Sequence, residues 1–175
     1  MLFERLKLRG AWLVKPQPIS DSRGFFSRVV CEEEFKEHGL KNRWLQQNIA
    51  FNHMRGTLRG LHFQKGDAAE IKVVRCTRGS IYDVIVDFRR KSPTYLAWIG
   101  VELSAENHNM LYIPEGFAHG YITLTDNAEI FYLVSSVYTP EAEGGLRYDD
   151  PKLGIVWPLD PVIISDKDRS WAYLE

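Results

Sequence analysis

Short apolar or alternating stretches, separated by turn residues, make up most of the chain from residue 71 onward. This pattern is typical of a sandwich or barrel in which each strand crosses the core once and reverses at a turn. The expected strands are Lys72–Cys76, Ile81–Phe88, Tyr95–Leu103, Met110–Ile113, Gly120–Leu124 and Ala128–Tyr138. The pattern therefore predicts an all-β protein.

Two of these strands indicate how the sheet is covered. Alternation places Asp83 and Asp87 on the same strand face as Ile81 and Ile85, so one face is partly polar. The stretch Ala128–Val134 is almost entirely apolar, which predicts cover on both faces, by the barrel interior and by a second layer or subunit. This is a first indication of oligomerisation.

Helical signals are few. Glu32–His38, followed by Gly39 as a C-cap, predicts one short surface helix. From Pro151 to Pro161 the prolines predict a loop that wraps the barrel, with regular structure only near Asp168. No repeat, linker or low-complexity tract divides the chain, so residues 1–175 are expected to form one domain.

Charge and cysteine content narrow the function classes. The formal net charge is −1, from 22 basic and 23 acidic residues, which argues against nucleic acid or an anionic membrane as a partner. Cys31 and Cys76 have neither disulfide nor zinc-site spacing, and both are expected to be free thiols in a reducing compartment. Charged residues interrupt Met1–Lys15, so no signal peptide is expected and the cytoplasm is the predicted location.

Polar groups within apolar strands mark the candidate chemistry. Arg59 and His62 lie in the glycine-punctuated stretch Gly56–Gln64. A spacing of three points them to opposite faces of a regular strand, whereas a bulge at Gly60 would alter this. The spacing alone leaves both arrangements open.

Three further segments carry candidate groups, and each also has a purely structural interpretation. His119 follows a turn, Tyr132 lies within an apolar strand, and Asp168 ends a short charged stretch. A single barrel histidine is more often a satisfied core residue, and a tyrosine hydroxyl is often tied to a carbonyl. Asp168 would ordinarily be a solvated N-cap, and Lys72 or Arg59 an extended surface side chain.

Taken together, the motifs resemble the dTDP-4-dehydrorhamnose 3,5-epimerase family over nearly the whole chain. They are Asp21–Phe26, Leu58–Gln64, Ser92–Thr94, Leu103–Asn107, Ile113–Gly120, Asp150-Pro151, Trp157-Pro158 and Ser165–Asp168. Several ordered motifs at matching separations are stronger evidence than any one of them. The resemblance implies a cupin-like jelly-roll barrel of antiparallel strands with a few short peripheral helices, a homodimer, and no metal or nicotinamide.

The resemblance also implies residue roles. His62 would be the general base, Asp168 its orienting partner, Tyr132 the general acid, and Lys72 the group beside the 4-keto oxygen. The implied substrate-binding residues are Arg23, Phe26, Gln47, Arg59, His119 and Tyr138. Among these, Arg59 resembles a diphosphate ligand, Arg23 and Phe26 match positions that reach substrate from a partner subunit, and Gln47 and Tyr138 resemble nucleotide-side contacts.

This chemistry requires these residue types. A ketone at C4 acidifies the hydrogens on C3 and C5, so a histidine can remove one of them. The resulting enolate needs a cation or donor, and inversion needs an acid on the opposite face. The expected reaction converts dTDP-4-dehydro-6-deoxy-D-glucose to dTDP-4-dehydro-L-rhamnose through inversion at both carbons.

Other interpretations remain open at this stage. The chain departs from the family pattern at Arg28, where an acidic residue is common, and at Glu70, where glutamine is common. An epimerase of one carbon only, or one for another nucleotide, is therefore an alternative. A metal-dependent cupin oxygenase is disfavoured because Gln64 stands two residues after His62, where such a site has a second histidine. A non-catalytic sugar-nucleotide binding module is the third alternative.

Overall fold

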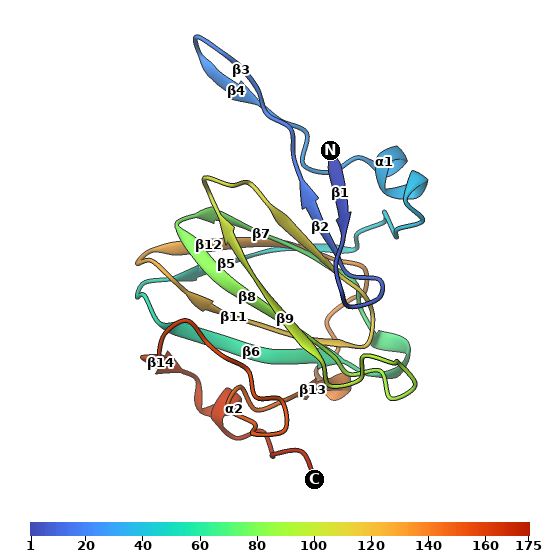
Figure 1. The fold of residues 1–175 in the computed structure, drawn as a ribbon, viewed down its shortest axis with the longest axis vertical. Helices are drawn as coiled ribbons and strands as arrows, with labels where there is room; N and C mark the ends of the chain where they lie inside the picture. The colour runs from blue at the N-terminus through green and yellow to red at the C-terminus, as the bar shows by residue number, and fades with distance from the viewer.

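Two antiparallel sheets face each other across the core of the computed structural model, which describes residues 1–175 (Figure 1). The first sheet runs in the order β1 (Leu2–Arg5), β2 (Trp12–Lys15), β10 (Met110–Ile113), β7 (Lys72–Arg78), β12 (Ala128–Val134), β5 (Gln46–Asn52). The second runs in the order β13 (Glu143–Gly145), β6 (Thr57–Gln64), β11 (Phe117–Thr123), β8 (Ser80–Asp87), β9 (Trp98–Ser104), and the short β14 (Ile163–Ile164) pairs parallel to β6. The all-β, cupin-like architecture expected from the sequence is confirmed.

The remaining elements lie outside these sheets. The hairpin of β3 (Ile19–Asp21) and β4 (Gly24–Phe26) projects away from the barrel (Figure 1). The helices α1 (Glu32–Glu37) and α2 (Asp166–Arg169) are short, as are the 3-10 turns η1 (Gly66–Ala68) and η2 (Pro140–Ala142). The helix predicted at Glu32–His38 is confirmed to within one residue, and no helix is long and apolar enough to cross a membrane.

Side-chain alternation divides the core as the sequence predicted. On β8, Ile81 and Ile85 join the cluster between the sheets, whereas Val84 and Val86 join a second cluster outside the second sheet. Asp83 shares the parity of Ile81 and Ile85 and is fully buried, so the partly polar strand face is the barrel interior. Buried carboxylates need partners, and Asp83 finds one in the site described below.

The C-terminal segment covers the outer face of the second sheet, as its prolines suggested. Leu146, Leu153 and Trp157 pack against Val84 and Val86 there. The first sheet is covered over only part of its outer face, where Phe35 of α1 packs into a seven-residue cluster with Leu133 of β12. On the edge strand β5, Ile49 remains 65% exposed. The predicted two-sided cover of β12 is therefore present within the chain beneath α1, and the surface beyond it, on β5, is open.

The turn that follows β8 is held by a buried carboxylate. The carboxylate of Asp87, fully buried at the end of β8, accepts hydrogen bonds from Ser92 Oγ at 2.5 Å, Thr94 Oγ1 at 2.6 Å and Arg89 Nη2 at 2.7 Å. Burial alone would raise the pKa of Asp87, but these donors outweigh it and hold that pKa well below its usual range. The Ser92–Thr94 motif thus anchors the turn between β8 and β9.

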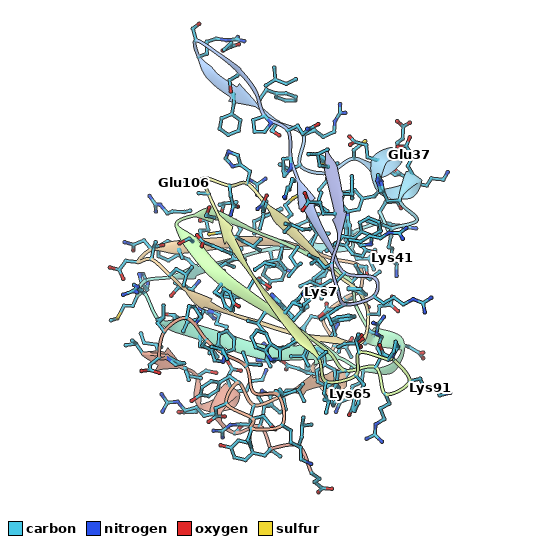
Figure 2. All side chains as sticks on the ribbon, in the orientation of Figure 1. Lys7, Glu37, Lys41, Lys65, Lys91 and Glu106 are labelled. Carbon is cyan, nitrogen blue, oxygen red and sulfur yellow. The ribbon has the colours of Figure 1, made fainter.

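Several strand boundaries differ from the prediction, and the largest difference is at β12, which ends at Val134 and not at Tyr138. The strand expected from Tyr95 begins at Trp98, because Leu96 has φ of 66° and Ala97 N–H closes a turn onto Thr94. Conversely, β11 begins at Phe117, where pairing with Asp87 extends it toward the turn. Side chains fill the space between the sheets, and the charged residues labelled in Figure 2 are all exposed. They are Lys7, Glu37, Lys41, Lys65, Lys91 and Glu106.

Candidate active site

A bulge on β6 brings two polar side chains to the barrel interior. His62 pairs with His119 and Arg59 pairs with Tyr121, so Gly60 and Leu61 together stand opposite a single residue of β11. This irregularity changes the parity between Arg59 and His62, and both side chains line one cavity. Of the two arrangements that the sequence left open, the structure has the bulged one.

The cavity encloses about 490 Å³, a volume within the usual range for a small-molecule site. Both sheets contribute to its walls. The sequence-predicted residues that line it are Arg59, His62, Lys72, His119, Tyr132 and Asp168. Six side chains from four strands and one helix therefore meet in a single space, although they are spread over more than half of the chain.

A buried carboxylate stands behind the imidazole of His62. Asp168 Oδ1 lies 2.5 Å from His62 Nε2, and Asp168 Oδ2 accepts from the Gly60 N–H at 3.2 Å. Ser165 caps α2 by accepting from the Asp168 N–H at 3.1 Å, which places this side chain at the start of a helix that packs on β6. Asp168 is 3% exposed and is thus no solvated cap.

The protonation of this pair follows from its geometry. Burial alone would raise the pKa of Asp168, but the hydrogen bonds from His62 and the Gly60 N–H outweigh it and lower that pKa below its usual range. An ionised carboxylate only accepts hydrogen bonds, so His62 Nε2 carries the proton and donates it. The lone pair of Nδ1 is then the one able to take a proton from a substrate.

Tyr132 and His62 stand on opposite walls. Tyr132 belongs to β12 of the first sheet, and His62 to β6 of the second. No hydrogen bond ties the Tyr132 hydroxyl to the chain, whereas the hydroxyl of neighbouring Tyr121 accepts from Asn52 Nδ2 at 3.3 Å. Tyr121 lies on β11, in the same sheet as His62. Of the two cavity tyrosines, only Tyr132 faces the base from the other sheet.

Burial raises the pKa of both tyrosine hydroxyls in the cavity. Burial raises the pKa of Tyr121 to about 12. Burial and, second to it, the nearby Glu70 carboxylate raise the pKa of Tyr132, although Arg59 acts in the opposite direction. Tyr132 is therefore a protonated phenol across the neutral pH range, as a proton donor must be.

A cation lies beside Tyr132. Lys72 begins β7, adjacent to β12, and its Nζ donates to Glu70 Oε1 at 2.6 Å. The Lys72 side chain is 15% exposed and that of Glu70 only 8%. Lys72 therefore offers an ammonium to the cavity, held by a carboxylate that the sequence marked only as a departure from the family.

His119 has a carboxylate of its own. Its Nε2 lies 3.0 Å from Asp83 Oδ2, while Asp83 Oδ1 is buried with no hydrogen-bond partner. Burial raises the pKa of Asp83, although His119 and Lys72 act against this. Because His119 is the register partner of His62, two imidazoles stand side by side on the cavity wall, each backed by a buried aspartate.

The mouth of the cavity is basic. Arg59 Nε donates to Asn52 Oδ1 at 2.7 Å, which fixes one edge of the guanidinium. Lys167 also lines the cavity, and its Nζ donates to Glu143 Oε2 at 2.6 Å. The same Glu143 oxygen accepts from the Tyr138 hydroxyl at 3.0 Å, so Tyr138 is linked to the rim although it is 54% exposed.

Besides Tyr138, three predicted binding residues lie outside this cavity. Arg23 and Phe26 belong to the projecting hairpin, where the Arg23 side chain is 87% exposed and pairs with Asp21. Gln47 pairs with Leu133, which packs on the outer face of the first sheet, so Gln47 faces away from the cavity. The structure does not bring these three side chains to the cavity of their own chain.

A metal-binding role finds no support in the donor set. Gln64 is 4% exposed, its Nε2 donates to the Ala68 carbonyl at 3.0 Å, and its Oε1 accepts from the Thr139 N–H at 2.6 Å. Its amide is thus committed to the backbone. No group of three or more histidine, cysteine, aspartate or glutamate side chains is arranged as metal ligands.

The chain is similar to known proteins in its sequence. A sequence profile of the family described as dTDP-4-dehydrorhamnose 3,5-epimerase matches residues 5–175. The chain belongs to the dTDP-4-dehydrorhamnose 3,5-epimerase family. Membership of this family makes it an isomerase and confirms the family resemblance read from the sequence.

Individual members of this family are similar to the chain in sequence and in structure. A dTDP-4-dehydrorhamnose 3,5-epimerase of Methanothermobacter thermautotrophicus is 45% identical, covering 98% of this chain and 94% of the relative. The crystal structure of the Bacillus anthracis dTDP-4-dehydrorhamnose 3,5-epimerase with TDP and PPi bound superposes with a TM-score of 0.96 at 38% identity, covering 99% of both chains. A dTDP-4-dehydrorhamnose 3-epimerase of Streptomyces niveus is 35% identical, covering 97% of this chain and 82% of the relative.

Sequence reasoning missed several residues of the site. Glu143 begins the three-residue strand β13 and Lys167 lies in the four-residue helix α2, and charged residues in such short elements resemble any solvated surface. Trp171 packs against Gly145, the register partner of His62, and its ring meets the His62 ring edge-on with centroids 6.5 Å apart. Only for Asp83 did a signal exist, because its parity placed it with Ile81 and Ile85 inside the barrel.

Proposed function

We propose that this epimerase inverts C3 and C5 of dTDP-4-dehydro-6-deoxy-D-glucose, with His62 as base and Tyr132 as acid. The observation that carries the proposal is the placement of these two side chains on opposite sheets around one cavity. Inversion requires removal of a proton from one face of a carbon and return of a proton to the other. Facing sheets deliver one group to each side of a sugar.

In the proposed reaction, His62 Nδ1 removes the hydrogen from C3 or C5, and the electron pair moves onto the C4 oxygen to form an enolate. Asp168 stabilises the imidazolium that results, and the Lys72 ammonium stabilises the enolate oxygen. Tyr132 then protonates the same carbon from the opposite face, and solvent restores both groups. Arg59 at the mouth holds the diphosphate, so that the sugar lies between base and acid.

Deuterium exchange tests this reaction. The wild-type enzyme, incubated with the ketosugar in deuterated water, is expected to place deuterium at C3 and C5 of the product. His62→Ala should abolish the exchange. Absence of deuterium at both carbons in the wild-type reaction would refute the proposal.

Tyr121 provides a matched control for the acid. Tyr132→Phe removes the hydroxyl opposite the base and should impair reprotonation more than proton removal, whereas Tyr121→Phe removes a hydroxyl on the same sheet as the base. We expect product formation to fall by about 10²-fold or more in Tyr132→Phe and by less than about 10-fold in Tyr121→Phe. Equal turnover of Tyr132→Phe and wild type would exclude the acid assignment.

One alternative is favoured by a specific comparison. Because the Streptomyces niveus relative is named a 3-epimerase, a family member can act at one carbon. The same incubation separates the two reactions: deuterium at C3 alone, with the C5 hydrogen retained, indicates a single-carbon epimerase. The identities of 45% and 35% favour inversion at both carbons.

We propose further that residues 1–175 act as one domain within a homodimer, in which the hairpin completes the partner's site. Three observations support this: Ile19 and Phe26 on the hairpin are 73% and 70% exposed, the outer face of β5 is open at Ile49, and Gln47 lies on that same face. Arg23 and Phe26 would then reach substrate across the interface, with Gln47 and Tyr138 on the nucleotide side. The free thiols of Cys31 and Cys76 support a cytoplasmic location.

Complementation tests the shared site. Arg23→Ala and His62→Ala are each expected to be nearly inactive alone. A mixed dimer would hold one site with an intact His62 and an intact Arg23, so refolding the two variants together should restore activity. No restoration in verified mixed dimers would show that Arg23 does not act across the interface.

A further inference from the structure

The ion pair between Glu70 and Lys72 is the most buried of the lysine–carboxylate pairs of the molecule. The pairs Lys15–Glu4 and Lys41–Glu115 lie on the surface, with side chains between 36% and 50% exposed. In the Glu70–Lys72 pair, the side chains are 8% and 15% exposed and the N–O distance is 2.6 Å. Removing two charges this far from water is costly, so such a pair calls for an explanation beyond stability.

Lys72 has a second carboxylate within electrostatic range. Asp83 interacts favourably with its charge, and Asp83 Oδ1 is buried without a hydrogen-bond partner. An ammonium released from Glu70 would be drawn toward that unpartnered oxygen, deeper in the barrel. Glu70 and Asp83 therefore compete for the same ammonium, and the structure shows it on Glu70.

Glu70 also acts on the acid side of the cavity. Burial is the main reason why the pKa of Tyr132 is raised, and the Glu70 carboxylate raises it further. The titratable groups that line the cavity together with this phenol are Lys72 from β7, Arg59 and His62 from β6, His119 and Tyr121 from β11, and Lys167 and Asp168 from α2, while β5 contributes the uncharged Ala50. Arg59 opposes Glu70 by lowering the pKa of Tyr132.

From this geometry we propose that Glu70 is a positioning residue for the epimerisation, holding the ammonium of Lys72 at the cavity wall beside Tyr132 and away from Asp83. The inference rests on the proposed function, because it concerns where the C4 oxyanion is bound. Its consequence is a defined oxyanion position: the ammonium is fixed on one side by Glu70 and leaves its other N–H donors for the enolate oxygen.

Three substitutions of Glu70 separate its effect on the position of Lys72 from the effect of its negative charge. Glu70→Ala removes both the hydrogen bond and the charge, whereas Glu70→Gln keeps an oxygen that accepts from Lys72 Nζ and removes only the charge. Glu70→Asp keeps the charge one methylene further away. Glu4→Gln, which neutralises the surface pair with Lys15, serves as the matched control and should match wild type.

The expected results are specific. Glu70→Ala should lower kcat by about 10-fold to 100-fold with KM within about 3-fold, which is less than removal of an oxyanion donor causes, because Lys72 is displaced but still present. Glu70→Gln should recover most of that kcat at neutral pH. The alkaline limb of the pH profile of kcat for Glu70→Gln should move to lower pH, because Tyr132 loses a neighbouring negative charge and deprotonates more readily. The Kd of dTDP, measured by calorimetry, should stay within about 2-fold, since the pair acts on the sugar.

Other outcomes overturn the inference. If kcat and the pH profile of Glu70→Ala match wild type, Glu70 does not position Lys72. If Glu70→Gln loses as much kcat as Glu70→Ala and both melt at lower temperature, the role is structural. The wild-type deuterium exchange keeps the two proposals apart: exchange in wild type with unchanged Glu70 variants removes only this inference, whereas no exchange in wild type removes the epimerase mechanism with it.

Discussion

The bulge at Gly60 allows a quantitative prediction about both stability and catalysis. Gly60 has φ of 109°, and a Cβ added there would lie 2.6 Å from the His119 carbonyl oxygen and 2.7 Å from Gly120 Cα. Both neighbours are backbone atoms of β11, so the strands themselves would have to separate. The unusual backbone costs a non-glycine residue about 1–3 kcal/mol, and overpacking adds about 1–3 kcal/mol. We therefore expect Gly60→Ala to lose about 2–6 kcal/mol of unfolding free energy.

Gly66 separates the two contributions. Its φ of 59° is also left-handed, but a Cβ there would have no atom within 4 Å. Gly66→Ala should therefore lose only the backbone contribution, about 1–2 kcal/mol. Urea unfolding of both variants, followed by circular dichroism, measures the difference.

The same substitution should affect turnover. Separating β6 from β11 moves His62 relative to Asp168 and Tyr132, and a displacement of about 1 Å can lower kcat by about 10²-fold. Equal losses of stability in the two glycine variants, or a Gly60→Ala enzyme with wild-type kcat, would refute the assignment of the bulge as the device that aims His62.

Further predictions concern the paired carboxylates and the diphosphate site. The folded-state pKa of Asp168 is lowered, so its contribution to stability is present above its unfolded pKa of about 3.9 and is lost as pH falls through the folded value. The pKa of Asp83 is raised, so its contribution is present below about pH 3.9 and is lost as pH rises through the folded value. The loss of stability caused by Asp168→Asn should therefore grow from acid to neutral pH, whereas the loss caused by Asp83→Asn should shrink. Thermal unfolding of both variants at several pH values measures these losses. The same pH dependence in both variants would contradict the prediction. Arg59→Lys should weaken dTDP binding by about 10-fold in calorimetry, because lysine lacks the fork that Asn52 fixes, whereas the surface variant Arg55→Lys should not.

Alternation along the chain was sufficient to predict β7 to β12 and the partly polar face of β8, because side-chain direction in a strand depends only on parity. The strands β1 to β5 and the short β13 and β14 were not predicted. The turn at Leu96 was not predictable, since its left-handed backbone follows from the anchoring of Ser92 and Thr94 on Asp87. The spacing of Arg59 and His62 could not predict whether their side chains share one face of the strand, because this depends on how β11 pairs with the bulge.

Parts of the site depend on contacts between distant segments. Asp168 looked like a solvated cap because nothing in its neighbourhood shows that α2 packs on β6. The environment of Lys72 required knowledge of Glu70 and Asp83 together, which only the folded barrel provides. Arg23, Phe26 and Gln47 were named through the family resemblance, and within one chain they lie on the projecting hairpin and on the outer face of β5.

The separation of the His62–Asp168 pair along the chain sets an order for biosynthesis. Asp168 follows His62 by 106 residues, so His62 is added to the chain long before the carboxylate that orients it. The main strands of both sheets can pair while the base still lacks its partner and the cavity still lacks the wall formed by residues 163–168. Activity should therefore be acquired only after α2 has been synthesised and has docked on β6.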